Sequence, residues 1–290
     1  MANAKAKVGV IGGSGLGDAL CSQTEGRAVE VQTPFGAPSD KIITTVWEGV
    51  EIAILNRHGP GHSIPPSSVN YRANIYALKA LGCTHVIASG AVGSLREEIR
   101  PKDLVIPDQI IDRTKSRVNT FFGRGLVAHV GFAEPFCPAL SDVLYQVAKE
   151  MGVKVHKAGT YIAMEGPLFS TKAESYLYRS WGASVIGMTA LPEAKLAREA
   201  ELCYATLAFA TDYDCWHEAE ETVTIEMVIS NLMKNVDTAK RIIRAAASRV
   251  PVQRDCPCAT ALANAIVTAS HLIPAEVKRD LALLIGKYVQ

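Results

Sequence analysis

The stretch CYATLAFATDYD, residues 203–214, is a run of apolar and small residues that ends in two acidic residues. Its composition and length predict a buried β-strand over residues 203–211. Aspartate is a poor strand former and is costly to bury, so Asp212 and Asp214 need a reason to follow this strand. One reason is structural, a solvated turn or a cap for a helix that begins near Thr222. The other is chemical, a site at the strand end.

Strand and helix patterns alternate on both sides of this stretch. Further strands are predicted at residues 7–12, 42–47, 50–55, 84–90, 103–111, 159–165 and 183–189. Helices are predicted at residues 70–82, 138–152, 192–201, 222–249, 259–270 and 274–288. This alternation predicts an α/β fold, a single domain over residues 1–290 with a central mixed β-sheet flanked by helices and a C-terminal helical segment at about 252–290. Residues 113–136 are predicted to form a long loop, and such loops are often functional.

The composition bounds the class of partner. The chain has 290 residues, with 30 Lys and Arg against 29 Asp and Glu, a net charge of +1. This balance argues against nucleic acid or a membrane surface as a partner, although it allows a local anion site. No apolar run approaches the ~20 residues of a membrane span, and the N-terminus lacks the pattern of a signal peptide. We therefore expect a cytoplasmic protein.

The seven cysteines are scattered, and no pair has the CxxC spacing of a zinc site. We therefore expect no metal. Cys256-Pro-Cys258 is the one close pair, and the sequence leaves open whether it forms a disulfide or two free thiols.

The segment GVIGGSGLGD, residues 9–18, follows the first predicted strand. It does not have the spacing of a dinucleotide-binding loop, because the third glycine would stand at position 18, which is Asp18, and no amphipathic helix is predicted after it. Two interpretations stay open. The segment is either a Gly-Ser nest, in which backbone N–H groups and Ser14 bind an anion, or a structural tight turn.

A second anion-binding candidate is LNRHGPGHS, residues 55–63, which also follows a strand. The planar fork of Arg57 suits phosphate, and His58 adds a donor; the alternative is an ion pair of Arg57 with an acid elsewhere in the chain. His62 is more typical of a structural hydrogen-bonding residue. Small residues at 89–94 and the hydroxyl of Thr189 end two more strands, where α/β proteins bind ligands. Together these strand ends predict an oxyanion site.

At this point the residues resemble a known family. Segments such as TPFGAPSD, NRHGPGHSIPPSSVNYRANIYALK, EGPLFSTKAES, GMTALPEAKLAREAELCYA and ATDYDCW resemble the trimeric purine nucleoside phosphorylase superfamily and, within it, the 5′-methylthioadenosine phosphorylases. The resemblance covers residues 8–216. It implies the phosphorolysis of 5′-methylthioadenosine to adenine and 5-methylthioribose 1-phosphate, a step of purine and methionine salvage, with inorganic phosphate as a co-substrate and no cofactor.

The resemblance also implies which residues form the site. Phosphate would be bound by Ser14, Arg57, His58, the backbone at Gly90 and Ala91, and Thr189. The nucleoside would be bound by Met188, Phe169, Ser170, Asp212, Tyr213, Asp214 and His62, with Ile225, Val228 and Ile229 along the methylthio group. His129 would come from the neighbouring subunit of a homotrimer, with a hexamer built as a dimer of trimers as the alternative.

The chemistry gives the acidic pair a role. When the purine C–N bond breaks through an oxocarbenium-like state, negative charge grows on the base, and a general acid at N7 neutralises it. Asp212 can serve as that acid if burial and the neighbouring Asp214 raise its pKa. An ionised carboxylate accepts from the amino group of adenine and repels the O6 of hypoxanthine. The 6-oxopurine relatives carry Asn where Asp212 stands and Glu at the position of Ser170, so adenine nucleosides are expected over inosine.

Several alternatives stay open at this point. Ile225, Val228 and Ile229 lie at i, i+3 and i+4, a spacing that ordinary core packing explains as well as a methylthio pocket does. Gly90 stands where animal members carry Thr, so one hydroxyl contact to phosphate is expected to be missing, and Gly187 and Leu168 replace an Asn and an Arg. The competing functions are a nucleosidase, which uses water in place of phosphate, and a non-catalytic adenine-nucleoside binding protein.

Overall fold

One mixed sheet of 11 strands runs through the computed structural model, which describes residues 7–13, 15–217 and 225–289. The order is β2-β3-β4-β1-β5-β10-β9-β7, and β11, β6 and β8 branch from β5. The strands are β1 Lys7–Gly12, β2 Arg27–Val29, β3 Ile42–Trp47, β4 Val50–Asn56, β5 His85–Ser94, β6 Leu104–Ile106, β7 Gln109–Arg113, β8 Val155–Lys157, β9 Thr160–Met164, β10 Val185–Gly187 and β11 Cys203–Asp212. The predicted α/β fold with a mixed central sheet is confirmed.

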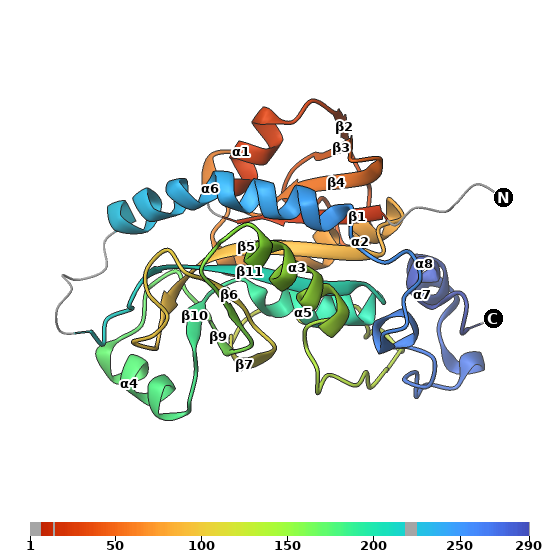
Figure 1. Ribbon diagram of the computed structural model, residues 1–290. Coiled ribbons are helices and arrows are strands. Elements are labelled where there is room, and N and C mark those ends of the chain that lie inside the picture. Colours follow the sequence, from red (N-terminus) through yellow and green to blue (C-terminus); the bar gives the residue numbers. More distant parts are fainter. Residues whose placement is uncertain (1–6, 14, 218–224, 290) are drawn as a thin grey trace.

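Helices cover both faces of the sheet (Figure 1). They are α1 Leu16–Gln23, α2 Tyr71–Ala80, α3 Pro138–Glu150, α4 Lys172–Ser180, α5 Ala190–Glu199, α6 Ile225–Ala247, α7 Ala275–Asp280 and α8 Ala282–Ile285. On one face α1, α3 and α6 pack in one apolar cluster with Leu207 and Phe209 of β11. On the other, α2, α5, α7 and α8 pack with Tyr204 and Ala208. Because its side chains enter both clusters alternately, β11 is buried on both faces, as parallel central strands are.

Four predictions about elements are wrong, three of them in the segments at 13–23, 103–111 and 259–270. A helix does follow the glycine-rich segment: α1 buries Leu16 and Leu20, but eight residues are too few to show a clear period. The predicted strand 103–111 is divided into β6 and β7 around Pro107, which lacks the N–H that a strand ladder needs. No helix spans 259–270; there the chain forms 3₁₀ turns, and Ile266 makes a β-bridge with Ala128.

The helix predicted at 274–288 is two short helices, α7 and α8, while α4 was not predicted. The signal for α4 was present, because Thr171 and Glu174 form a reciprocal capping box at its start. Among the described residues, no helix combines the length and the hydropathy that a membrane crossing requires.

Candidate active site

The ends of β1 and β4 and the middle of β5 meet at one edge of the sheet. Gly12 at the end of β1 lies opposite Asn56 at the end of β4, and the next residue, Arg57, donates its backbone N–H to Gly12 O at 3.0 Å. A Cβ on Gly13 would lie 2.6 Å from Ser89 O and 2.9 Å from Arg57 Nη1. Only glycine therefore allows the segment after β1 to approach Arg57 and β5 this closely.

Arg57 makes the ion pair that the sequence left open as an alternative. Its Nε and Nη2 lie 2.5 and 2.9 Å from the Glu193 carboxylate, and its Nη1 donates to Ser89 O at 2.9 Å. Arg57 is 1% exposed and Glu193 fully buried, with the Tyr204 hydroxyl donating to Glu193 at 2.9 Å. Among the described residues these bonds use three of the five guanidinium N–H groups, so the fixed fork keeps two donors for an anion.

His58 is held as a neutral ring. Its Nδ1 lies 2.9 Å from Ile64 O, and since a carbonyl only accepts, Nδ1 carries the proton. Burial, with a contribution from the Arg57 charge, lowers the pKa of His58 to about 3. The ring stacks on His62 with centroids 4.1 Å apart, and burial also lowers the pKa of His62. At neutral pH His58 therefore offers an acceptor at Nε2 in place of the donor that the sequence predicted.

Thr189 faces the same edge from the far side of β5. It is the N-cap residue of α5 and is 9% exposed. A Cβ on Gly90 would lie 3.8 Å from Thr189 Oγ1, so the hydroxyl points at β5, where Gly90 and Ala91 are half-buried. A hydroxyl in this position can donate to an anion at the same edge. The structure thus brings Arg57, Gly90 and Thr189 together; Ser14 lies outside the described residues.

The acidic pair is not a solvated turn. Asp212 and Asp214 are 4% and 8% exposed. Asp212 Oδ1 accepts the backbone N–H of Asp214 at 2.7 Å, and Oδ2 accepts the Thr211 hydroxyl at 2.7 Å. Both residues lie against Gly93 of β5, where a Cβ would lie 3.0 Å from Asp212 Oδ1 and 3.2 Å from Asp214 Cβ. Gly93 therefore makes the space that the two acids occupy.

The two carboxyl groups have different surroundings. Asp214 has a positive φ of 53°, which Asp tolerates better than most residues. Burial raises the pKa of the Asp214 carboxyl, and the nearby Ser175 hydroxyl, the Cys215 backbone N–H and the Ser170 hydroxyl oppose that rise. We call the strand ends that bring Arg57, Gly90 and Thr189 together the anion edge. The two buried carboxyl groups lie three positions along β5 from it, and one of them has a raised pKa. This combination is typical of a catalytic site.

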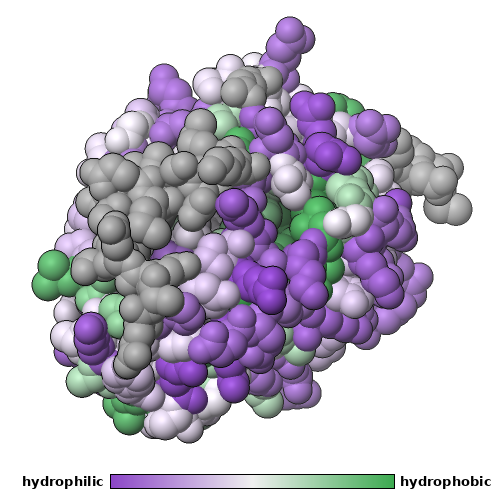
Figure 2. Space-filling view, turned by 60° about the vertical axis from the view of Figure 1, so that its left-hand side comes forward, coloured by the Kyte–Doolittle hydropathy of each residue, from purple (hydrophilic) through white to green (hydrophobic). Residues whose placement is uncertain are grey.

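Of the remaining predicted substrate residues, Ser170 adjoins the acidic segment, because the Cys215 thiol donates to Ser170 O at 3.3 Å. Met188 and Ser170 are half-buried, Phe169 is 48% exposed, and Tyr213 stacks on His217 with centroids 4.5 Å apart. Figure 2 shows one face of the molecule, on which a small group of hydrophobic residues lies among mostly hydrophilic ones.

Four predicted residues are not joined to the site by the described contacts. His129 is exposed, and its backbone N–H donates to Ala265 O at 2.8 Å. Ile225, Val228 and Ile229 belong to the first turns of α6, and their side chains lie outside the described part of the structure. The methylthio pocket therefore stays a prediction.

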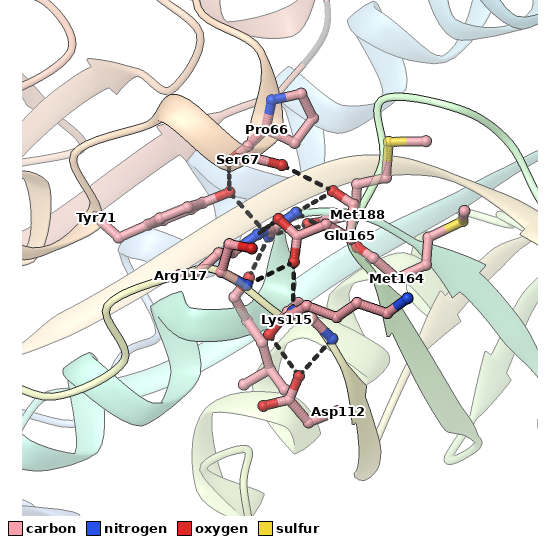
Figure 3. Close-up of polar contacts among 12 residues, drawn as sticks. Pro66, Ser67, Tyr71, Asp112, Lys115, Arg117, Met164, Glu165 and Met188 are labelled. Atoms are coloured by element: carbon pink, nitrogen blue, oxygen red, sulfur yellow. Dashed lines mark hydrogen bonds and ion pairs between the residues drawn. The ribbon is translucent and has the colours of Figure 1, made fainter.

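Sequence reasoning missed Arg117, which links three segments beside the site (Figure 3). Its guanidinium donates to the carbonyl oxygens of Met188 and Leu191, to Glu165 O and to the Tyr71 hydroxyl. Its Nε lies 3.2 Å from the Glu165 carboxylate, which also accepts the Lys115 N–H. Desolvation raises the pKa of Glu165, but the Ser67 hydroxyl, the Lys115 N–H and Arg117 together lower it to about 2. The available signal was the long loop at 113–136, which contains Arg117. Arg117 fixes the backbone that carries Met188.

Tyr161 was also missed. It is 3% exposed on β9, and burial raises the pKa of its hydroxyl, while the nearby Arg57 charge and the backbone N–H groups of Thr189 and Ala190 oppose that rise. A Cβ on Gly187 would overlap that hydroxyl and lie 2.7 Å from Tyr161 Cζ. The glycine at 187 is thus explained by the tyrosine that occupies the adjacent space and supports Thr189.

Comparison with known proteins agrees with this geometry. The family model described as the phosphorylase superfamily matches residues 7–248. The chain belongs to the phosphorylase superfamily. It is 58% identical, over 97% of its length and 99% of the relative's, to a Geobacter sulfurreducens protein named S-methyl-5′-thioadenosine phosphorylase.

Solved structures of the superfamily superpose closely on the chain. A methylthioadenosine phosphorylase from an antarctic soil metagenomic library has a TM-score of 0.90 at 48% identity, covering 97% of this chain and 99% of that chain. A mutant of the adenosine/methylthioadenosine phosphorylase from Schistosoma mansoni, in complex with methylthioadenosine, has a TM-score of 0.82 at 35% identity, covering 97% of this chain and 98% of that chain. The resemblance seen in the sequence is confirmed.

Proposed function

We propose that this phosphorylase-superfamily member converts 5′-methylthioadenosine and inorganic phosphate to adenine and 5-methylthioribose 1-phosphate. The observation that carries the proposal is the position of the buried pair Asp212 and Asp214, which lies against Gly93 of β5. Gly90, three residues earlier on the same strand, faces Thr189 and adjoins Arg57. The relatives named above carry this activity in their names.

In the proposed reaction, phosphate is bound by the two remaining Arg57 donors, the Gly90–Ala91 backbone and Thr189. One of its oxygens forms the new bond to C1′, and its charge stabilises the oxocarbenium-like transition state. The bond from C1′ to the purine breaks, and its electron pair goes to the base. Asp212 gives its proton to N7, so adenine leaves neutral and Asp212 becomes a carboxylate. The bond from Asp214 N–H to Asp212 Oδ1 stabilises that carboxylate.

Preference for adenine follows from the acceptor character of the site. Once Asp212 has given up its proton, its carboxylate accepts from the N6 amino group of adenine and would repel the O6 of hypoxanthine, and the half-buried Ser170 adds no charge beside it. Met188, held by Arg117, and Phe169 contact the ribose and the base in this proposal. The methylthio group lies toward the start of α6, along Ile225, Val228 and Ile229.

The decisive experiment measures adenine release from 5′-methylthioadenosine with and without phosphate. The proposal requires release that depends on phosphate, together with formation of the sugar phosphate. Equal release in phosphate-free buffer would instead identify a nucleosidase, and tight binding without release would identify a binding protein. A comparison of kcat/KM between methylthioadenosine and adenosine tests the pocket, since equal values would contradict an apolar site for the 5′ group.

We further propose a homotrimer in which His129 reaches a neighbouring subunit. Support comes from its exposure and from the exposed apolar side chains of Val127 and Val267, 47% and 63% exposed, on the paired segments beside it. The proposal includes a role in purine and methionine salvage in the cytoplasm, because phosphorolysis recovers both halves of the nucleoside. Sedimentation velocity tests the trimer and distinguishes it from a hexamer.

A further inference from the structure

Four of the seven cysteines, which the sequence places far apart, converge in the fold. The Sγ atoms of Cys137, Cys203, Cys256 and Cys258 all lie within 4.8 Å of one another. Three of these residues are buried and Cys256 is half-buried, and all four are free thiols. They lie in the apolar cluster under α3 and α6, where aliphatic side chains could fill the same space, so packing alone does not call for four sulfurs at one point.

The sulfurs come from three separate segments. Cys137 is the N-cap residue of α3, and its backbone N–H donates to Tyr204 O at 2.8 Å. Cys203 is the first residue of β11. Cys256 and Cys258 flank Pro257 at the start of a 3₁₀ turn in the C-terminal segment. A point shared by these segments is held from three directions, as structural metal sites are.

The spacing of the sulfurs suits one central atom. In a tetrahedral zinc site with Zn–S bonds of about 2.3 Å, neighbouring sulfurs lie about 3.8 Å apart. Cys203 Sγ lies 3.3 Å from Cys256 Sγ, and no two of the four sulfurs are more than 4.8 Å apart. Disulfides would instead divide the four sulfurs into pairs joined at about 2.05 Å. A metal ion requires all four sulfurs to meet at one point, whereas two disulfides require only that they meet in pairs.

The charge around the cluster also favours a thiolate site. Cys137 caps the N-terminus of the 13-residue helix α3, where the helix dipole favours negative charge. A four-thiolate site with a divalent ion has a net charge of −2, and the helix dipole at Cys137 offsets part of it.

We infer that Cys137, Cys203, Cys256 and Cys258 form a structural site for a thiophilic metal ion of the Zn²⁺ class, which fixes the C-terminal segment to α3 and β11. The site is separate from the acidic pair and from the anion edge, since Cys203 lies at the opposite end of β11 from Asp212. Its metal therefore takes no part in phosphorolysis.

The test is zinc retention by the full chain. The protein is purified with a thiol-free reductant, loaded with Zn²⁺, dialysed against metal-free buffer and measured by inductively coupled plasma mass spectrometry. About one zinc per chain is expected for the parent and for the control Cys83→Ala, which removes a buried cysteine outside the cluster. The double variant Cys256→Ser with Cys258→Ser should retain less than about a tenth of that amount.

A spectroscopic measurement on the parent protein keeps the inference falsifiable if the double variant does not fold. Co²⁺ should give thiolate-to-metal charge-transfer absorption and the visible bands of a tetrahedral site, and Zn²⁺ should displace it. A strong chelator should lower Tm in the parent and the control alike. Absence of retained zinc and of the cobalt bands would overturn the inference. So would alkylation mass spectrometry that finds these cysteines linked in pairs, about 2 Da lighter per pair, in metal-free protein isolated without reductant.

Discussion

At the residue scale, Asp212 carries the proposed proton transfer. Asp212→Asn keeps an oxygen that accepts the Asp214 N–H, so the fold should persist. The amide cannot donate a proton to N7 as an acid, and its N–H₂ group suits O6 better than N6. We expect kcat/KM for methylthioadenosine to fall by about 10²–10⁴-fold, while the ratio of inosine to adenosine turnover rises.

The measurement is phosphorolysis of methylthioadenosine, adenosine and inosine by parent and variant, with Tm as the check on folding. An Asp212→Asn variant that keeps both its rate and its adenine preference at unchanged Tm would contradict the assignment of Asp212 as the acid.

The burial of Asp214 predicts how the stability of the fold depends on pH. Burial raises the pKa of its carboxyl above the ordinary value of 3.8, so the folded chain holds this proton more tightly than the unfolded chain does. Ionised Asp214 therefore costs stability at neutral pH, and that cost disappears as the pH falls through the raised pKa toward 3.8. Asp214→Asn should raise Tm at pH 7.5, and the gain should shrink at pH 4.5, while turnover of adenine nucleosides falls. A pH-independent difference in Tm between parent and variant would contradict this linkage.

Residues at strand ends could be predicted from the sequence, but their partners could not. A polar residue after an apolar run is visible locally, which is why Asp212, Arg57 and Thr189 were identified. Arg57 and Glu193 lie 136 positions apart, and nothing in a single sequence states that they meet. The same reason explains why His58 was expected to donate: its neutral state depends on Ile64 O and on burial.

At the element scale, Gly187 on β10 and Tyr161 on β9 form a matched pair. Gly187→Ala places a methyl group on the Tyr161 hydroxyl and close to Cζ, so we expect a loss of about 1–3 kcal/mol in the free energy of unfolding. Tyr161→Phe should not relieve it, because Cζ stays 2.7 Å from the new methyl. Tyr161→Leu should relieve part of this loss. Urea unfolding of the parent, Gly187→Ala, Tyr161→Leu and their double variant measures the coupling between the two positions. Additive losses in the Gly187→Ala and Tyr161→Leu double variant would contradict the match.

Arg117 connects elements that the sequence separates. Arg117→Met removes donors from the carbonyls of Met188 and Leu191 and leaves the Glu165 carboxylate without its ion pair. We expect a loss on the order of 3 kcal/mol and a fall in Tm of about 6 °C or more, with a raised KM for the nucleoside because Met188 loses its support.

The matched control is Arg124→Met, because Arg124 is exposed and pairs with Glu276 and Asp280 on the surface. A surface pair contributes about 0–1 kcal/mol, so its Tm should hardly change. Equal falls in Tm for the two variants would remove the argument for a structural link at Arg117.

Long apolar elements were predictable, while two of the three-residue strands, β2 and β8, were not. β11 has ten residues buried on both faces, and its long apolar run predicts a buried strand. β2 and β8 have three residues each and are set by their pairing with β3 and β6. The helix expected at 259–270 failed for a similar reason, because Ile266 pairs with Ala128 and that distant contact overrides the local pattern.

At the scale of the whole molecule, the C-terminal segment is held at a buried acid. Glu201, 2% exposed, accepts the Leu262 N–H at 3.1 Å and the Tyr288 hydroxyl at 2.6 Å, and Lys287 Nζ lies 2.5 Å from its other oxygen. The backbone of the same segment pairs with residues 127–129, which present His129. The segment thus supports the surface proposed to meet a second subunit.

That assembly makes a prediction about mixed oligomers. If each site takes Asp212 from one chain and His129 from the next, then His129→Ala and Asp212→Asn are each defective alone. Random co-assembly of equal amounts should restore about a quarter of the parent activity, because one site in four receives both intact residues. Activity that stays at the average of the two variants would place His129 outside the neighbouring site.

The two reactive ends of the site are built on one continuous strand. Gly90, at the anion edge, and Gly93, under the acids, are three residues apart on β5, a span of about 10 Å in extended chain. Backbone covalent geometry, which side-chain substitutions cannot stretch, therefore sets the gap between the attacking oxygen and the departing ring. Evolution can alter the 5′ end of the ligand, which other elements contact, while this spacing and the reaction that depends on it stay constant.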